Sequence, residues 1–234
     1  MEWKEDENGL LCVWGFDGGD TLADESRFWY GVVSTPMLED RRITILEVIR
    51  LLQISPGIFV RNPRANPVVL PAKAWNDPTD VSRDQTTALI ALLGDLKEYG
   101  YLSSNEILKL ILTYQLKRFG LFPNKDIAGP SDWANYIRAF RNRWLWFLLP
   151  ILDLELLVNS IIRIFYSLDN NADDLNHTVR LRQAQKIMPT PISYVARKLY
   201  KHFRNVQEAW NRYYAPTTGN NPLNEIYRKI IEEL

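Results

Sequence analysis

The sequence predicts an all-α protein, a single domain of eight to ten helices arranged as an α/α toroid-like or irregular helical bundle. Apolar residues recur every three to four positions through most of the 234 residues, which places them on one face of a helix. Helix-start and helix-stop residues separate these periodic stretches. No stretch alternates apolar and polar residues as a half-buried strand does. The single domain covers 1–234, with 1–20 as an N-terminal arm and 58–79 as a long proline-rich loop.

Glycine and proline divide the first half of the chain into helices. The expected helices are 21–34, 40–53, 81–99 and 103–119. In the second of these, Ile43, Leu46, Ile49 and Leu52 are expected on one buried face. Gly100 and Gly120 follow the last two helices, as expected for residues that take the left-handed conformation at a helix end.

The second half of the chain predicts longer helices. They are expected at 131–149, 152–168, 172–187, 192–203, 205–214 and 222–230. Ser131 is the expected cap of the first, and Pro150 should break or kink it because proline lacks the N–H that a helix interior uses. The stretch 144–165 is apolar enough to consider for a membrane, but its polar second half makes burial in lipid costly. It therefore predicts a buried helix hairpin or a kinked central helix.

Charge and cysteine content limit the classes of function. The 28 basic and 28 acidic residues cancel, so nucleic acid is not a favoured partner and neither is a membrane surface. The one cysteine, Cys12, excludes an intrachain disulfide framework. The acidic N-terminus lacks the basic and apolar regions of a signal peptide. These features predict a cytoplasmic or virion-associated protein.

The densest group of functional side chains stands at the start of the helix expected at 81–99. Ser82 and Gln85 have the spacing of a capping box, in which each side chain bonds the other residue's backbone N–H. Arg83 opposes the helix dipole in the first turn, so it needs a carboxylate such as Asp80, Asp84 or an aspartate elsewhere. A structural ion network and a ligand site both fit this pattern.

A second polar group precedes the first helix. Asp17 and Asp20 flank two glycines, and such carboxylates could bind a divalent cation or act as the acid and base of a glycosidase. A tight turn followed by a helix cap is the plainer interpretation. Arg27 and Tyr30 lie further along the helix, where they could reach a cleft shared with Arg83.

Three other patterns have plain structural interpretations. The stretch 169–180 begins like a calcium loop but lacks its glycine and final glutamate. The aromatic residues of 133–147 could form a sugar-stacking platform, although helical spacing favours a core role. The basic stretch 180–204 could contact phosphates, although a solvated helix face is favoured. The histidines lack metal-ligand spacing, so neither a metal nor a cofactor is predicted.

Acidic and hydroxyl groups recur at three expected helix starts. These are 17–21, 77–82 and 129–132. Helix pairs whose odd-numbered members begin on the same side would gather these starts around one cleft, as in toroids and solenoids. The recurrence supports such an architecture only weakly.

Three segments carry a resemblance to a group of helical proteins from phages and bacteria. They are Asp17 to Thr21, 75–85 with its Ser-Arg-Asp-Gln, and 188–193 with its Pro-Thr-Pro. The group resembles this chain in having a Gly-Asp-Ser or Gly-Asp-Thr helix start, a following arginine and the other two motifs. It has no established activity, so the resemblance implies a phage context and a shared site but assigns no catalytic residue.

Two hypotheses follow from these patterns. In the first, a polar cleft binds or processes a glycan, a chemistry suggested by fold analogy alone. Its catalytic residues would be Asp20, Asp80 and Asp84. Its ligand-binding residues would be Asp17, Arg27, Tyr30, Ser82, Arg83 and Gln85. In the second, the protein is a non-enzymatic phage structural or accessory protein and the same residues form an ion network. The expected partners are a polysaccharide or a phage protein.

Overall fold

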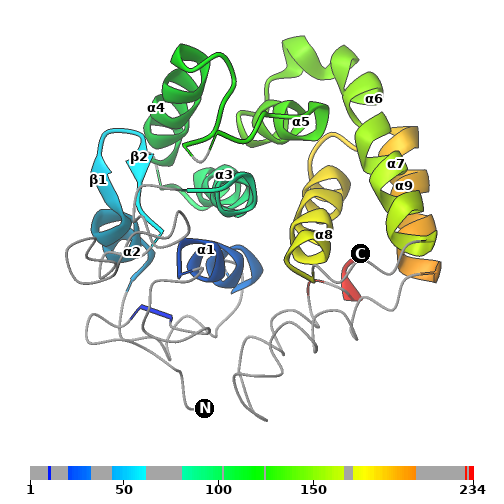
Figure 1. Ribbon diagram of the computed structural model, residues 1–234, viewed down its shortest axis with the longest axis horizontal. Coiled ribbons are helices and arrows are strands. Elements are labelled where there is room, and N and C mark those ends of the chain that lie inside the picture. Colours follow the sequence, from blue (N-terminus) through cyan, green and yellow to red (C-terminus); the bar gives the residue numbers. More distant parts are fainter. Residues whose placement is uncertain are drawn as a thin grey trace.

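The computed structural model confirms the all-α prediction (Figure 1). It describes residues 10–11, 21–32, 44–61, 81–101, 103–123, 125–165, 171–203, 230 and 232–234. The only sheet among these residues is a two-stranded hairpin. The expected N-terminal arm, most of the proline-rich loop and the expected helices 205–214 and 222–230 lie almost wholly outside this part of the chain.

The described elements follow the predicted order. The α-helices are α1 (Thr21–Val32), α2 (Ile45–Leu52), α3 (Arg83–Glu98), α4 (Ser103–Lys117), α5 (Pro130–Ala139), α6 (Leu149–Leu152), α7 (Leu154–Phe165), α8 (Asn171–Lys186) and α9 (Pro191–Phe203). A 3-10 helix, η3 (Arg143–Leu148), joins α5 to α6. The strands are β1 (Gln53–Ser55) and β2 (Ile58–Phe59), which pair antiparallel.

Helix α3 lies at the centre of the described fold, in contact with α1, α4, α5 and α8 (Figure 1). Its residues 88–93 are all buried, as a helix with neighbours on every side requires. Gly94 lets α5 approach closely, because a Cβ there would stand 2.8 Å from the Cα of Ala139. One apolar core joins α1, α3 and α8 with parts of the surrounding helices. This arrangement is an irregular bundle built around α3.

Helix α2 is shorter than predicted and turns a different face inward. Thr44 caps it, with Glu47 completing a capping box. Its buried residues include Ile45 and Val48, whereas Leu46 is 49% exposed. The expected face was therefore wrong in part. The chain then turns through Pro56 and Gly57 into the small hairpin, so 58–59 is a strand rather than loop.

The long helix expected at 131–149 is instead three elements. Gly129, not Ser131, is the N-cap of α5, and Pro130 takes the first helical turn, where its missing N–H costs nothing. Helix α5 ends at Ala139, and Arg141 takes a positive φ of 53°. Pro150 breaks no helix because it stands in the first turn of α6. The helix thus ends at Ala139, well before the expected break at Pro150.

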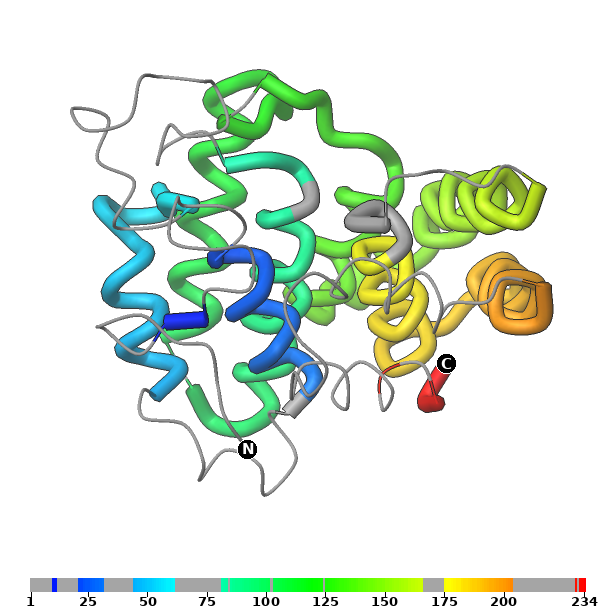
Figure 2. Tube along the Cα trace, turned by 60° about the horizontal axis from the view of Figure 1, so that its bottom comes forward, coloured from blue at the N-terminus to red at the C-terminus, as the bar shows by residue number. Residues whose placement is uncertain are grey.

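The stretch 143–165 is largely exposed, which corrects the expectation of a buried hairpin. Trp144 is 89% exposed, and Trp146 and Phe147 are also exposed rather than in the core. By length and composition alone, Arg143–Phe165 is the one helical stretch among the described residues that could cross a membrane. In Figure 1 α6 and α7 lie at the right edge of the molecule with α9 beside them. Figure 2 shows α7 and α9 side by side beyond α8.

Helix α9 buries one narrow face. Ser193, Ala196 and Tyr200 are its buried residues. Val195 and Phe203 are exposed. Helix α9 packs mainly on α7, so these two helices extend the exposed edge together.

Helix α8 is buried although its sequence is polar. All residues from 175 to 184 are buried, among them Asn176, His177, Arg180 and Arg182. The expectation of a solvated basic face is therefore wrong for this helix. Such burial requires a partner for each charge, because an unpaired ion inside a protein is costly.

Candidate functional site

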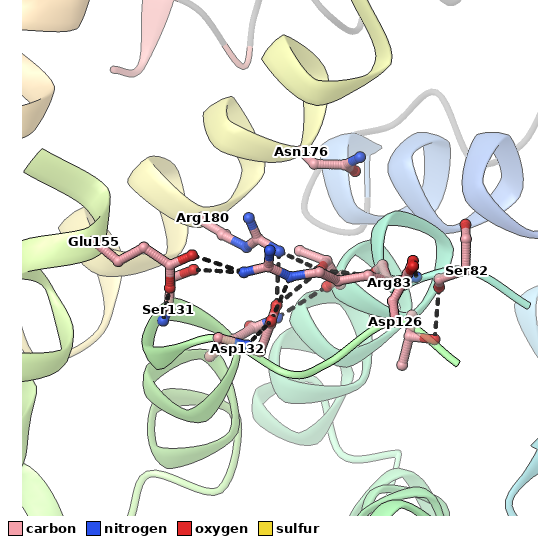
Figure 3. A network of polar contacts seen from close by, with 12 residues as sticks. Ser82, Arg83, Asp126, Ser131, Asp132, Glu155, Asn176 and Arg180 are labelled. Carbon is pink, nitrogen blue, oxygen red and sulfur yellow. Dashed lines mark hydrogen bonds and ion pairs between the residues drawn. The ribbon is translucent and has the colours of Figure 1, made fainter. Parts of the chain in front are cut away.

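Four charged side chains from four helices form the candidate site, here called the Arg83 cluster (Figure 3). Arg83 Nε donates to Asp132 Oδ2 at 2.5 Å, and its Nη2 donates to Glu155 Oε1 at 2.8 Å. Arg180 Nη2 donates to Asp132 Oδ1 at 2.6 Å. The cluster therefore joins α3, α5, α7 and α8 through two shared carboxylates.

Backbone N–H groups at the start of α5 donate hydrogen bonds to the carboxylates of Asp132 and Glu155. The Gly129 N–H donates to Asp132 Oδ2 at 2.9 Å, so Asp132 also caps the helix. The Ser131 N–H donates to Glu155 Oε2 at 2.6 Å. A Cβ at 129 would lie 2.6 Å from Arg83 Nη2, so glycine leaves room for the guanidinium in its present position. All four carboxylate oxygens of the cluster thus accept at least one bond.

The charges of the cluster balance, with two guanidinium groups and two carboxylates. Burial raises the pKa of Glu155, but hydrogen bonds from the Ser131 N–H and Arg83 lower it by more than burial raises it. The pKa of Glu155 is therefore below its ordinary value of 4.5. Burial lowers the pKa of Arg83, but the charges of Asp132 and Glu155 raise it by more, so the pKa of Arg83 is raised overall. Glu155 is therefore an anion at neutral pH, unsuited to act as a general acid.

Arg27 and Tyr30, both predicted site residues, are fully buried in α1. Arg27 donates to Asp24 at 3.4 Å and to Asn176 at 3.2 Å. Asn176 stands one helical turn before Arg180 on α8, and Arg180 bonds Asp132, which also accepts from Arg83 (Figure 3). Arg27 therefore contacts α8 directly, and Arg83 is linked to the same helix only through Asp132.

Tyr30 belongs to a second charged group. The Arg182 guanidinium stacks 4.8 Å from the Tyr30 ring centre and also pairs with Glu233. Lys186 pairs with the buried Asp95 at 3.2 Å. Burial, followed by the nearby Asp95, raises the pKa of the Tyr30 phenol, which therefore stays protonated. Tyr30 lies here rather than in the Arg83 cluster.

The remaining predicted site residues divide into two sets. Asp17, Asp20, Asp80 and the side chain of Asp84 lie outside the described residues, so the structure does not test their proposed roles. Ser82 is the N-cap of α3, and Gln85 accepts a bond from the Ser82 N–H at 3.0 Å. Gln85 thus has its predicted capping role.

Asp132, Glu155 and Arg180 were not predicted as site residues. The carboxylate expected somewhere for Arg83 is Asp132, which lies 49 residues along the chain. The recurring helix start at 129–132 was the one signal that pointed to it. Arg180 was hidden in the basic stretch, and Glu155 appeared only as a polar residue in an apolar segment.

A buried serine and histidine also lie at bonding distance. Ser160 Oγ is 2.8 Å from His177 Nε2, the geometry of a nucleophile and its base. Both side chains are buried, and burial together with Arg163 and Arg180 lowers the pKa of His177 well below its usual 6.5. With no surface access and a weakened base, the two residues are suited to packing rather than catalysis.

An open cavity of about 390 Å³ lies beside the exposed edge. Its lining includes Arg143, Trp146, Met188 and the Pro-Thr-Pro segment 189–191. The described residues contain no group of three or more His, Cys, Asp or Glu that could hold a metal ion.

The fold and the site together define an all-α protein with an internal network of charged residues. No protein-family model, curated protein or solved structure matches the chain.

We expect acid to weaken the contribution of Glu155 to stability. Its pKa is lowered in the folded protein, so the stabilisation is complete above the unfolded value near 4.5 and disappears as the pH falls through the folded value. Glu155→Gln should therefore cost about 1–2 kcal/mol at neutral pH. The difference from the unchanged protein should shrink below pH 4.5. Urea unfolding at several pH values measures it, and Glu106→Gln on the exposed side of α4 is the control.

Proposed function

We propose that the protein is a non-enzymatic structural or accessory protein, in which the Arg83 cluster holds four helices in a fixed arrangement. One observation carries the proposal: all four carboxylate oxygens of the cluster are engaged by arginines or backbone N–H groups. No free carboxylate is left there to take a proton from a substrate. The phage context is part of the proposal and is supported only by the sequence resemblance.

The burial of the cluster supports the same role. The Asp132 side chain is 1% exposed and that of Arg180 is 10% exposed, while Arg83 is 30% exposed. A ligand could reach Arg83 only at its outer edge, where it would have to compete with Glu155. An arginine that binds an anionic ligand instead has two parallel guanidinium N–H groups available to donate to that ligand.

The test compares Arg83→Ala with Arg50→Ala, an exposed arginine on α2. Loss of Arg83 leaves Asp132 with Arg180 and Glu155 with the Ser131 N–H, so the expected loss in unfolding free energy is about 1–3 kcal/mol. Arg50→Ala should change it by less than about 0.5 kcal/mol. Urea unfolding gives both values.

A glycan-binding screen on the same folded proteins decides between the two hypotheses. A ligand bound by the unchanged protein and lost in Arg83→Ala, with unfolding unaffected, would contradict the structural role.

Glycan binding is a second candidate, favoured by the cavity beside Trp146. An exposed indole can stack on a sugar ring, and Arg143 in the same lining could donate to hydroxyl groups. The catalytic form of this candidate would rest on Asp20, Asp80 and Asp84. If a glycan binds in the cavity, Trp146→Ala should abolish binding while Arg83→Ala retains it. Glycan binding that both variants retain would exclude the cavity.

A further inference from the structure

Most of the exposed large apolar side chains in the described fold lie on η3, α6, α7 and α9, and this surface is here called the apolar edge. It is defined by the exposed side chains of 143–165 and 191–203. Between 143 and 165, every exposed side chain except that of Arg143 is apolar. Ile151 is 66% exposed and Phe165 is 77% exposed. A concentration of exposed apolar side chains of this kind marks a binding face.

Within 143–165 and 191–203, the charges of the exposed side chains are all of one sign. Arg143, Lys198 and Lys201 are the exposed charged residues there, and α9 contains no acidic residue. The two acidic residues of 143–165 point inward, Asp153 to Arg138 and Glu155 to Arg83. Because the whole chain has a formal net charge of zero, this is a local excess of positive charge. A partner that fits it must be both apolar and negatively charged.

We propose that the apolar edge binds the surface of an anionic lipid bilayer. Interfacial segments combine apolar and aromatic side chains that enter the headgroup boundary with basic side chains that meet anionic lipids. Trp144 and Trp146 are exposed at one end of the edge, and indoles favour this boundary. The proposal does not depend on the role of the Arg83 cluster.

The same residues favour binding at the surface over crossing the bilayer. Spanning by 143–165 would carry Asp153 and Glu155 into lipid, away from the arginines that neutralise them. Pro150 and the 3-10 geometry of η3 also interrupt the stretch.

A second copy or a sugar fits the apolar edge less well. A symmetric dimer formed through this edge would bring two like-charged basic surfaces together. A sugar site needs several polar groups around its aromatic ring, whereas Arg143 is the only exposed charged or polar side chain among the neighbours of Trp146 in η3.

Co-sedimentation of the full chain with phosphatidylcholine vesicles, with and without phosphatidylglycerol, tests the proposal. We expect binding only to the vesicles with phosphatidylglycerol, weakened by salt. Lys198→Glu should weaken it at least about fivefold, since each lysine near an anionic surface contributes roughly that factor. Ile151→Asn should weaken it several-fold by removing buried apolar area.

Matched controls lie outside the segments that define the apolar edge. Ile127→Asn changes an isoleucine that is 74% exposed, and Lys109→Glu reverses an exposed lysine on α4. Both should bind like the unchanged chain. Equal losses in the controls, or no binding to anionic vesicles, would overturn the proposal. So would a stable dimer in light scattering that Ile151→Asn dissociates, because it would identify a second copy as the occupant.

Discussion

Asp132→Asn is expected to lower the unfolding free energy by about 3–5 kcal/mol, because it leaves the buried Arg180 and the partly buried Arg83 with the single charge of Glu155. Asp132 accepts from Arg83 at 2.5 Å and from Arg180 at 2.6 Å, and its side chain is 1% exposed. Asparagine has nearly the same shape, so the loss measures charge rather than packing. For a chain of this size the melting temperature should fall by roughly 10 °C, which differential scanning calorimetry would record.

Removing one of the two arginines that Asp132 neutralises should recover part of the unfolding free energy that Asp132→Asn loses. In Asp132→Asn/Arg180→Gln the charges balance again, so the double variant should lose less than the sum of the single changes. Glu106→Gln, an exposed carboxylate on α4, should leave the melting temperature unchanged. A melting temperature for Asp132→Asn equal to that of the unchanged protein would show that the arginines do not depend on this carboxylate.

Arg138→Ala should cost a similar amount, about 3–5 kcal/mol. Arg138 makes a two-pronged ion pair with Asp153, at 2.8 and 2.7 Å, and donates from Nε to the Ile187 carbonyl. Thr190 also donates to Asp153, at 2.6 Å. Without the Arg138 guanidinium, the Asp153 carboxylate, which is 0% exposed, keeps only the Thr190 hydroxyl as a side-chain donor. Urea unfolding monitored by circular dichroism measures the effect.

A matched arginine on the same side of the fold shows the role of burial. Arg141 pairs with Glu98 at 2.6 Å, but the two side chains are 28% and 52% exposed. Arg141→Ala should therefore cost no more than about 1 kcal/mol. The double change Arg138→Met/Asp153→Leu should regain most of the stability, since apolar residues can replace a buried ion pair. If it were as unstable as Arg138→Ala, the ion pair itself would not explain the loss.

Local signals in the sequence predicted most helix ends. Gly100 and Gly120 both take the positive φ that was expected after α3 and α4. Pro150 misled the prediction because proline in the first turn and proline in the interior have opposite effects on a helix. The break at Arg141 carries no such signal, since arginine rarely takes a positive φ.

The site was predictable only in part. The position of Arg83 in a first helical turn correctly indicated that it needs a carboxylate, and its ion pairs with Asp132 and Glu155 supply two. Which carboxylates these are could not be read from spacing, because Glu155 lies 72 residues away and is brought near by the packing of α7. Arg180 was misassigned because a buried polar helix and a solvated one have similar compositions.

The polar sequence of α8 has a consequence for the order in which the protein is made. Helices α1, α3 and α5 precede α8 in the chain, so a ribosome delivers the partners of Asn176 and Arg180 first. A nascent α8 exposes mainly groups that water solvates well, and this lowers its tendency to aggregate while it waits to dock. This buried helix can therefore remain in water until its binding place has formed.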